Sequence, residues 1–158
     1  ASYIRTEADE VTYNLHIMLR VEIEMGLMDG SLAVKDLPEI WNSKMQEYLG
    51  VVPPDDASGV LQDIHWSTGY IGSFPTYTIG NIMSAQFFAA ARRSISGLDE
   101  ALLAGDYRPL FSWLCDHIYR FGRTFSASEL LTRSTGHDLD TTDYVTYLKG
   151  KFGELFPE

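Results

Sequence analysis

Apolar residues recur at every fourth position along the first long segment of the chain, residues 7–28. Leu15, Leu19, Ile23 and Leu27 follow this spacing, which places them on one face of an α-helix. Acidic residues open the segment, where the positive end of a helix dipole stabilises them, and the sequence MDGS that follows is typical of a helix end. We therefore predict a long helix over residues 7–28, and a fold that buries its wide apolar stripe.

Other segments also have helix signals at their ends. Asp36 is predicted as an N-cap, with a proline in the first turn and a stop at Gly50. Another helix is expected to begin near Pro75 and to break near Gly97. Three more are predicted over residues 107–121, 126–135 and 141–155.

The overall pattern predicts an all-α fold. Ser126 and Glu129 have the spacing of a capping box, in which each side chain hydrogen-bonds the backbone near the other. No stretch combines strand alternation with hairpin turns. The chain has no repeats and no low-complexity linker, so we predict a single helical unit over residues 1–158.

Composition narrows the classes of function. A net charge of −10, without any cluster of basic residues, argues against nucleic acid as a partner. No apolar run is long enough to cross a membrane, and no signal peptide is visible. The single cysteine, Cys115, cannot form an internal disulfide and is predicted to be a buried thiol in a reducing cytoplasm.

The histidines and serines show no known catalytic spacing. The four histidines form no HExxH motif and no i, i+4 pair, so we interpret His16, His117 and His137 as structural or surface residues. A GxSxG motif is also absent. We therefore expect no metal site built wholly from this chain.

The stretch GVLQDIHWSTGYIGSFPTY, residues 59–77, is the strongest candidate for a site. Asp63 and His65 have a spacing that suits a turn in which a carboxylate orients an imidazole, and Trp66 beside them could exclude water. Glycines on both sides would let the backbone approach a ligand. The residues alone leave two interpretations open, a functional site and a well hydrogen-bonded structural turn.

Two motifs give the chain a family resemblance. IRTEADE, residues 4–10, resembles the IRxxAD motif of the carboxypeptidase Taq family of zinc metallopeptidases, and GVLQDIHW, residues 59–66, resembles its GxxQDxHW motif. FPTY, ELLTRSTG, YLKGKF and ELF also resemble the family's C-terminal third. The resemblance implies an all-helical, zincin-like fold and a cytoplasmic homodimer. It implies an enzyme that releases single residues from peptide C-termini, using zinc, for which cobalt can substitute.

The family's metal motifs, HExGH and HxES, normally precede IRxxAD, and neither occurs in these residues. The resemblance therefore implies a C-terminal fragment of such an enzyme, and the start without Met agrees with this expectation. The fragment alone is expected to bind no zinc and to hydrolyse no peptide. The alternative is a stand-alone helical module for binding or dimerisation, without catalysis.

Positions carried over from the motifs predict the substrate contacts. Arg5 is the expected partner of a substrate's terminal carboxylate, or of an acid that shapes the groove; the alternative is a structural ion pair with Asp9. His65 is the candidate catalytic residue, which is expected to hydrogen-bond the substrate or the oxyanion. Asp63 is expected to orient His65 and also to take part in substrate binding. Gln62 is expected to support the turn.

Trp66 is likewise expected to support the turn that contains Gln62.

The sequence departs from the family pattern at one position. Where many family members have a tyrosine, in GYFPTY, this chain has Ser73. Distantly related zinc peptidases place an oxyanion-stabilising tyrosine near this position, so Tyr70 and Tyr77 are the candidate substrate-binding phenols that could replace it.

Overall fold

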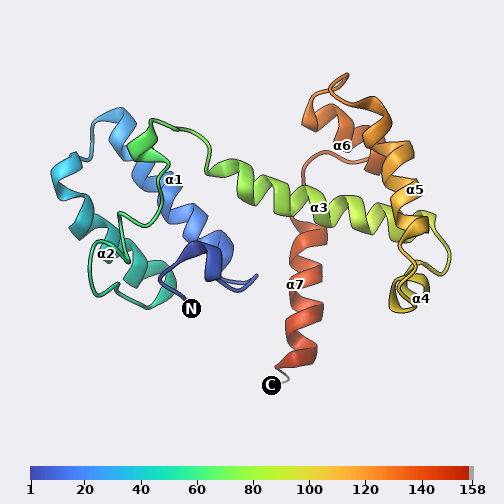
Figure 1. Cartoon of the computed structure of the whole chain (residues 1–158), viewed down its shortest axis with the longest axis horizontal. Coiled ribbons are helices and arrows are strands. Elements are labelled where there is room, and N and C mark those ends of the chain that lie inside the picture. The colour runs from blue at the N-terminus through green and yellow to red at the C-terminus, as the bar shows by residue number, and fades with distance from the viewer. Residues whose placement is uncertain (157–158) are drawn as a thin grey trace. The chain divides into compact units, whose positions relative to one another are not determined.

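The computed structural model describes residues 1–156 and is built of helices joined by turns, with no strand in the part that it describes (Figure 1). This confirms the predicted all-α class. The α-helices are α1 (Tyr13–Asp29), α2 (Leu37–Leu49), α3 (Pro75–Ser94), α4 (Leu98–Leu103), α5 (Arg108–His117), α6 (Ala127–Thr135) and α7 (Thr142–Leu155). Short 3₁₀ turns occur at η1 (Arg5–Glu7), η2 (Val34–Asp36), η3 (Trp66–Thr68) and η4 (Tyr119–Phe121).

The chain separates into two compact units, residues 1–79 and the residues from 80 onward. Each unit has its own apolar core, and the boundary falls within α3.

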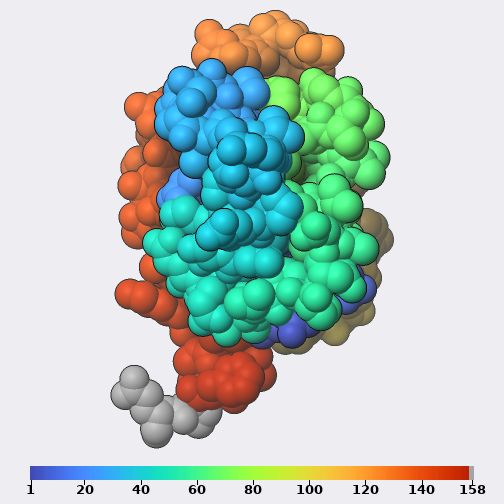
Figure 2. All heavy atoms as spheres, turned by 90° about the vertical axis from the view of Figure 1, so that its left-hand side faces the viewer, coloured from blue at the N-terminus to red at the C-terminus, as the bar shows by residue number. Residues whose placement is uncertain are grey.

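The first unit forms where α1 packs against α2. Leu19 and Ile23 of α1 meet Trp41 and Met45 of α2, and all four side chains are buried. Burial of each contributes about 1.5–3 kcal/mol relative to exposure. In Figure 2 this unit faces the viewer, and the residues that follow α2 lie against that helix at the surface.

The first helix begins later than predicted, at Tyr13 rather than residue 7. The side chain of Asp9 accepts hydrogen bonds from the backbone N–H groups of Val11 and Thr12, both at 2.9 Å, and from the Thr12 hydroxyl. These bonds satisfy N–H groups of a turn that precedes the helix, so α1 begins only after Thr12, and the 3₁₀ turn η1 lies before Asp9.

The second unit confirms most of the predicted helix ends. Gly97 adopts a left-handed φ of 74° between α3 and α4, and Ser126 and Glu129 form both hydrogen bonds of the capping box. The helix predicted over residues 107–121 instead stops at His117, because Ile118 leaves helical geometry. Cys115 is half-buried, not buried as predicted.

Candidate functional site

The site forms around Asp63, whose carboxylate binds two arginines. We call residues 59–74, which contain Asp63, the site loop. Arg5, from η1, donates from Nη2 to Oδ1 at 2.8 Å and from Nε to Oδ2 at 3.2 Å. Arg20, from α1, donates from Nε to Oδ2 at 2.6 Å. One carboxylate therefore joins the N-terminal turn, the first helix and the site loop.

Burial gives this cluster unusual electrostatics. Arg20 is 0% exposed, and burial lowers its pKa to about 10, although the charge of Asp63 opposes the shift. Burial by itself would raise the pKa of Asp63, but hydrogen bonds and charge from both arginines hold it below its ordinary value. All three groups are charged at neutral pH, so the cluster has a net charge of about +1.

Aromatic rings flank the two guanidinium groups. Arg20 lies 4.5 Å from the centre of the Trp41 ring, and Arg5 lies 4.8 Å from that of Tyr77. Such contacts stabilise a cation whose access to water is restricted, by about 0.5–2 kcal/mol each. Arg5 also donates from Nη1 to the Tyr13 hydroxyl at 3.0 Å. The structure thus realises the pairing of Arg5 with an acid, while the alternative ion pair with Asp9 is wrong.

His65 lies beside the cluster but is held by a tyrosine. Its Nδ1 is 3.8 Å from Oδ1 of Asp63, which is too long for a hydrogen bond, so the predicted orienting contact is not one. Its Nε2 is instead 3.1 Å from the Tyr77 hydroxyl. The tautomer of His65 sets the direction of this bond: Nε2 accepts from the Tyr77 hydroxyl when the proton is on Nδ1, and donates to it when the proton is on Nε2.

The imidazole is also surrounded by rings from the site loop. Its centre lies 4.5 Å from that of Phe74, and Tyr70 stacks on it at 6.0 Å with an angle of 22° between the rings. Tyr70 remains 61% exposed. The site therefore combines the buried ion pairs of Asp63 with the exposed aromatic ring of Tyr70. This arrangement can contact both the charged and the apolar groups of a ligand.

The remaining predicted residues have clear positions. Gln62 donates to the backbone carbonyl of Ala57 at 3.4 Å, within the same turn. Trp66 makes an edge contact with Trp41, with ring centres 6.3 Å apart. Ser73 is 5% exposed, and its hydroxyl is buried without a partner among the described residues.

Arg20 and Glu24 are site residues that the sequence analysis missed. Glu24 accepts from the Trp66 indole N–H and from the backbone N–H of Gly72. With His16, they form a series of buried polar residues spaced four apart on α1. Their spacing, on the side of α1 that also carries buried apolar residues, was the available signal, because buried charges nearly always have a specific partner.

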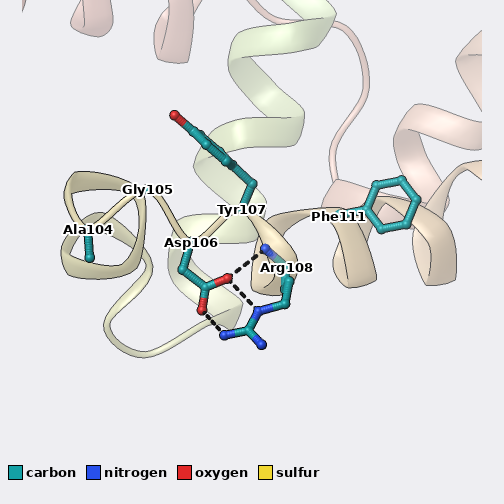
Figure 3. A pocket seen from close by; sticks show the side chains of 6 residues that line it. All are labelled: Ala104, Gly105, Asp106, Tyr107, Arg108 and Phe111. Carbon is teal, nitrogen blue, oxygen red and sulfur yellow. Dashed lines mark hydrogen bonds and ion pairs between the residues drawn. The ribbon is translucent and has the colours of Figure 1, made fainter.

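Other features of the described residues offer less chemistry. No three His, Cys, Asp or Glu side chains lie together there as a metal ion would require. No helix in that part is long and apolar enough to span a membrane. A shallow hollow of about 690 Å³ in the second unit, shown in Figure 3, is lined by Ala104, Gly105, Asp106, Tyr107, Arg108 and Phe111. Its charged groups neutralise each other, since hydrogen bonds from Arg108 lower the pKa of Asp106 to about 2.

Comparison with known proteins identifies relatives of both the sequence and the structure. The family model for carboxypeptidase Taq (M32) metallopeptidase matches residues 1–152. Thermostable carboxypeptidase 1 of Thermus thermophilus is 43% identical over 98% of this chain, and carboxypeptidase 1 of Bacillus subtilis is 37% identical over the same share. The matches cover 30% and 31% of those two proteins, so the chain spans about 30% of the length of these curated relatives.

Solved structures agree with the sequence matches. The crystal structure of the M32 carboxypeptidase from Deinococcus radiodurans has a TM-score of 0.94 and 47% identity, covering 98% of this chain and 31% of that one. Metallocarboxypeptidase 1 of Trypanosoma cruzi has a TM-score of 0.91 and 37% identity, covering 96% and 31%. These findings confirm the resemblance identified from the two motifs.

Proposed function

The chain belongs to the carboxypeptidase Taq (M32) metallopeptidase family, and we propose that it forms the substrate-groove part of an enzyme that releases single amino acids from peptide C-termini. The ion pair between Arg5 and Asp63 is the observation that most supports this function. It joins the two family motifs, one at residues 4–10 and the other at 59–66, beside the candidate catalytic His65.

The charge of the cluster suits a peptide terminus. Arg5 and Arg20 share one carboxylate, so a net positive charge of about one remains to attract the terminal carboxylate of a substrate. Arg20 Nη2 is buried without a partner among the described residues. Arg5 contributes by fixing Asp63 and by this charge, since Nε, Nη1 and Nη2 already bind Asp63 and Tyr13.

His65 and Tyr77 are the proposed hydrogen-bonding pair. Their contact at 3.1 Å links the imidazole to a phenol that can accept from or donate to a bound peptide. His65 is the proposed catalytic residue, contacting the substrate or the oxyanion that develops during hydrolysis. Tyr70, with its exposed ring, is the proposed contact for a substrate side chain.

The metal would be held by side chains other than those described. The residues that the structure describes do not fit a metal site, because no suitable group of ligands occurs among them. We propose zinc as the metal of the complete enzyme, with cobalt as a substitute. A cytoplasmic homodimer is part of the same proposal, supported by the single cysteine and by exposed apolar residues on α1 such as Met25 and Met28.

A stand-alone helical module for binding or dimerisation is the second candidate. Helix α7 favours it, because none of its residues is buried while Val145, Tyr147 and Leu155 are exposed. A binding partner or a second copy could cover that apolar surface.

Two experiments separate these functions. The 158-residue chain, supplied with zinc or cobalt, should not hydrolyse a blocked dipeptide; turnover that disappears on His65→Ala would contradict its dependence on other residues. The open reading frame that contains the chain should also encode an HExGH motif. A frame without one would contradict the enzyme and favour the module.

A further inference from the structure

Glu24 is a buried carboxylate whose two oxygens hold the site loop at separate points. The residue is 6% exposed and lies on α1. Oε2 accepts the indole N–H of Trp66 at 2.9 Å, and Oε1 accepts the backbone N–H of Gly72 at 2.8 Å. Among the described residues no basic side chain forms an ion pair with it, so both of its oxygens are bound by neutral N–H donors.

The chemistry of these two contacts requires a carboxylate. Both partners are donors, and an ionised glutamate offers an acceptor to each of them. A glutamine of the same shape would place its NH₂ group against one donor, leaving a buried N–H without a partner. Hydrogen bonds to a charged acceptor are also stronger than those to a neutral one.

The two anchored points, Trp66 and Gly72, enclose Tyr70 and adjoin His65. His65 directly precedes Trp66, and Tyr70 lies between Trp66 and Gly72. The Tyr70 backbone N–H donates to the His65 carbonyl at 2.8 Å. The stacking of Tyr70 on His65 therefore depends on a segment that Glu24 holds at both ends.

Without those anchors this segment would have considerable freedom. Gly69 and Gly72 both adopt left-handed φ angles, 72° and 77°, in a region where glycine has many alternative conformations. A carboxylate fixed on a packed helix limits these alternatives. Helix α1 thus supplies a rigid support for the turn.

We propose that Glu24 is a positioning residue of the carboxypeptidase site, which sets the placement of His65 and Tyr70 through its bonds to Trp66 and Gly72. This inference rests on the proposed function. A displacement of about 1 Å in a catalytic group can lower a rate by about a hundredfold, so the loss of one anchor should be measurable in turnover.

The test compares Glu24→Gln with Glu22→Gln in the intact gene product. Glu22 makes the matched control, because it lies on the same helix but binds Lys44 and Tyr48, away from the loop. Turnover of a blocked dipeptide is measured together with hydrogen–deuterium exchange over residues 66–72 and bound metal. Glu24→Gln should lower kcat about tenfold or more, with KM and metal content little changed and faster exchange in the segment. Glu22→Gln should leave kcat and exchange unchanged.

A second variant tests the same anchor in case Glu24→Gln does not fold. Trp66→Phe removes only the indole donor and should lower kcat by a smaller factor, again with faster exchange. Faster exchange with unchanged kcat in both variants would overturn the proposal, since Glu24 would then stabilise the fold alone. Unchanged exchange would overturn the anchoring itself. No turnover by the unmodified protein would overturn the proposed function, and the catalytic role of Glu24 with it.

Discussion

Arg20, wholly buried on α1, donates its Nε–H to Oδ2 of Asp63 at 2.6 Å, across 43 residues of sequence. One helical turn later, Glu24 binds the same loop from the same helix. The first helix therefore supports the site loop through two charged side chains of opposite sign. This arrangement makes the stability of the first unit and the geometry of the site interdependent.

Removing the charge of Asp63 should destabilise the protein strongly. Asp63→Asn leaves two buried or nearly buried guanidinium groups without a counter-charge, and the loss of one member of such a cluster costs about 3 kcal/mol. Urea unfolding should show this loss in the free energy of unfolding. Asp106→Asn, in an ion pair with the exposed Arg108, is the matched control and should change that free energy little. Equal effects of the two substitutions would contradict the importance assigned to Asp63.

His16 should make stability depend on pH between about 4 and 6.5. Burial, aided by the charge of Arg20, lowers its pKa from 6.5 to about 4, so the folded protein holds it neutral while the unfolded chain protonates it below 6.5. The unfolded state then binds more protons than the folded state, so the fraction of unfolded protein rises as pH falls. The free energy of unfolding should drop by up to about 3 kcal/mol from pH 7 to pH 4 through this group.

The measurement is urea unfolding at pH 7 and pH 5 for two variants. His16→Gln should reduce the difference in unfolding free energy between the two pH values, whereas His137→Gln, at an exposed position, should keep it. The same pH dependence in both variants would show that His16 does not cause it.

Alanine substitution of Gly72 and of Gly150 should change the stability of the protein in opposite directions. Gly72 has a φ of 77°, so Gly72→Ala places a side chain in the left-handed region and should destabilise the protein by about 1 kcal/mol. Gly150 lies within α7 with open space around it, and Gly150→Ala should stabilise that helix by about 0.5–1 kcal/mol. Thermal unfolding of the two variants should shift the midpoint in opposite directions, and a shift of the same sign would contradict this account.

Local signals predicted helix ends well. Gly50 and Gly97 stop or separate helices as expected, because a left-handed φ is a property of one residue. The capping box at Ser126 likewise involves residues only three apart. The start of α1 was missed because Asp9 satisfies the backbone N–H groups that a longer helix would have used.

The site was predictable only in part, because its contacts join distant segments. The family motifs pointed to Arg5, Asp63 and His65, and the structure brings these three together. Glu24 was missed, since its partner Gly72 lies 48 residues away and no local pattern specifies that pairing. Tyr77 was a candidate from its place near the family motif, but its contact with His65 follows from how α3 meets the site loop.

The most direct test of the proposed function is the turnover of a blocked dipeptide by the intact gene product with and without His65→Ala. The substitution should lower kcat/KM about a hundredfold or more while the bound metal stays the same, because a hydrogen bond to the transition state is lost. His137→Ala, at an exposed turn, should leave kcat/KM unchanged. Equal turnover by the unmodified protein and His65→Ala, or no turnover by the unmodified protein, would contradict a carboxypeptidase site built on this loop.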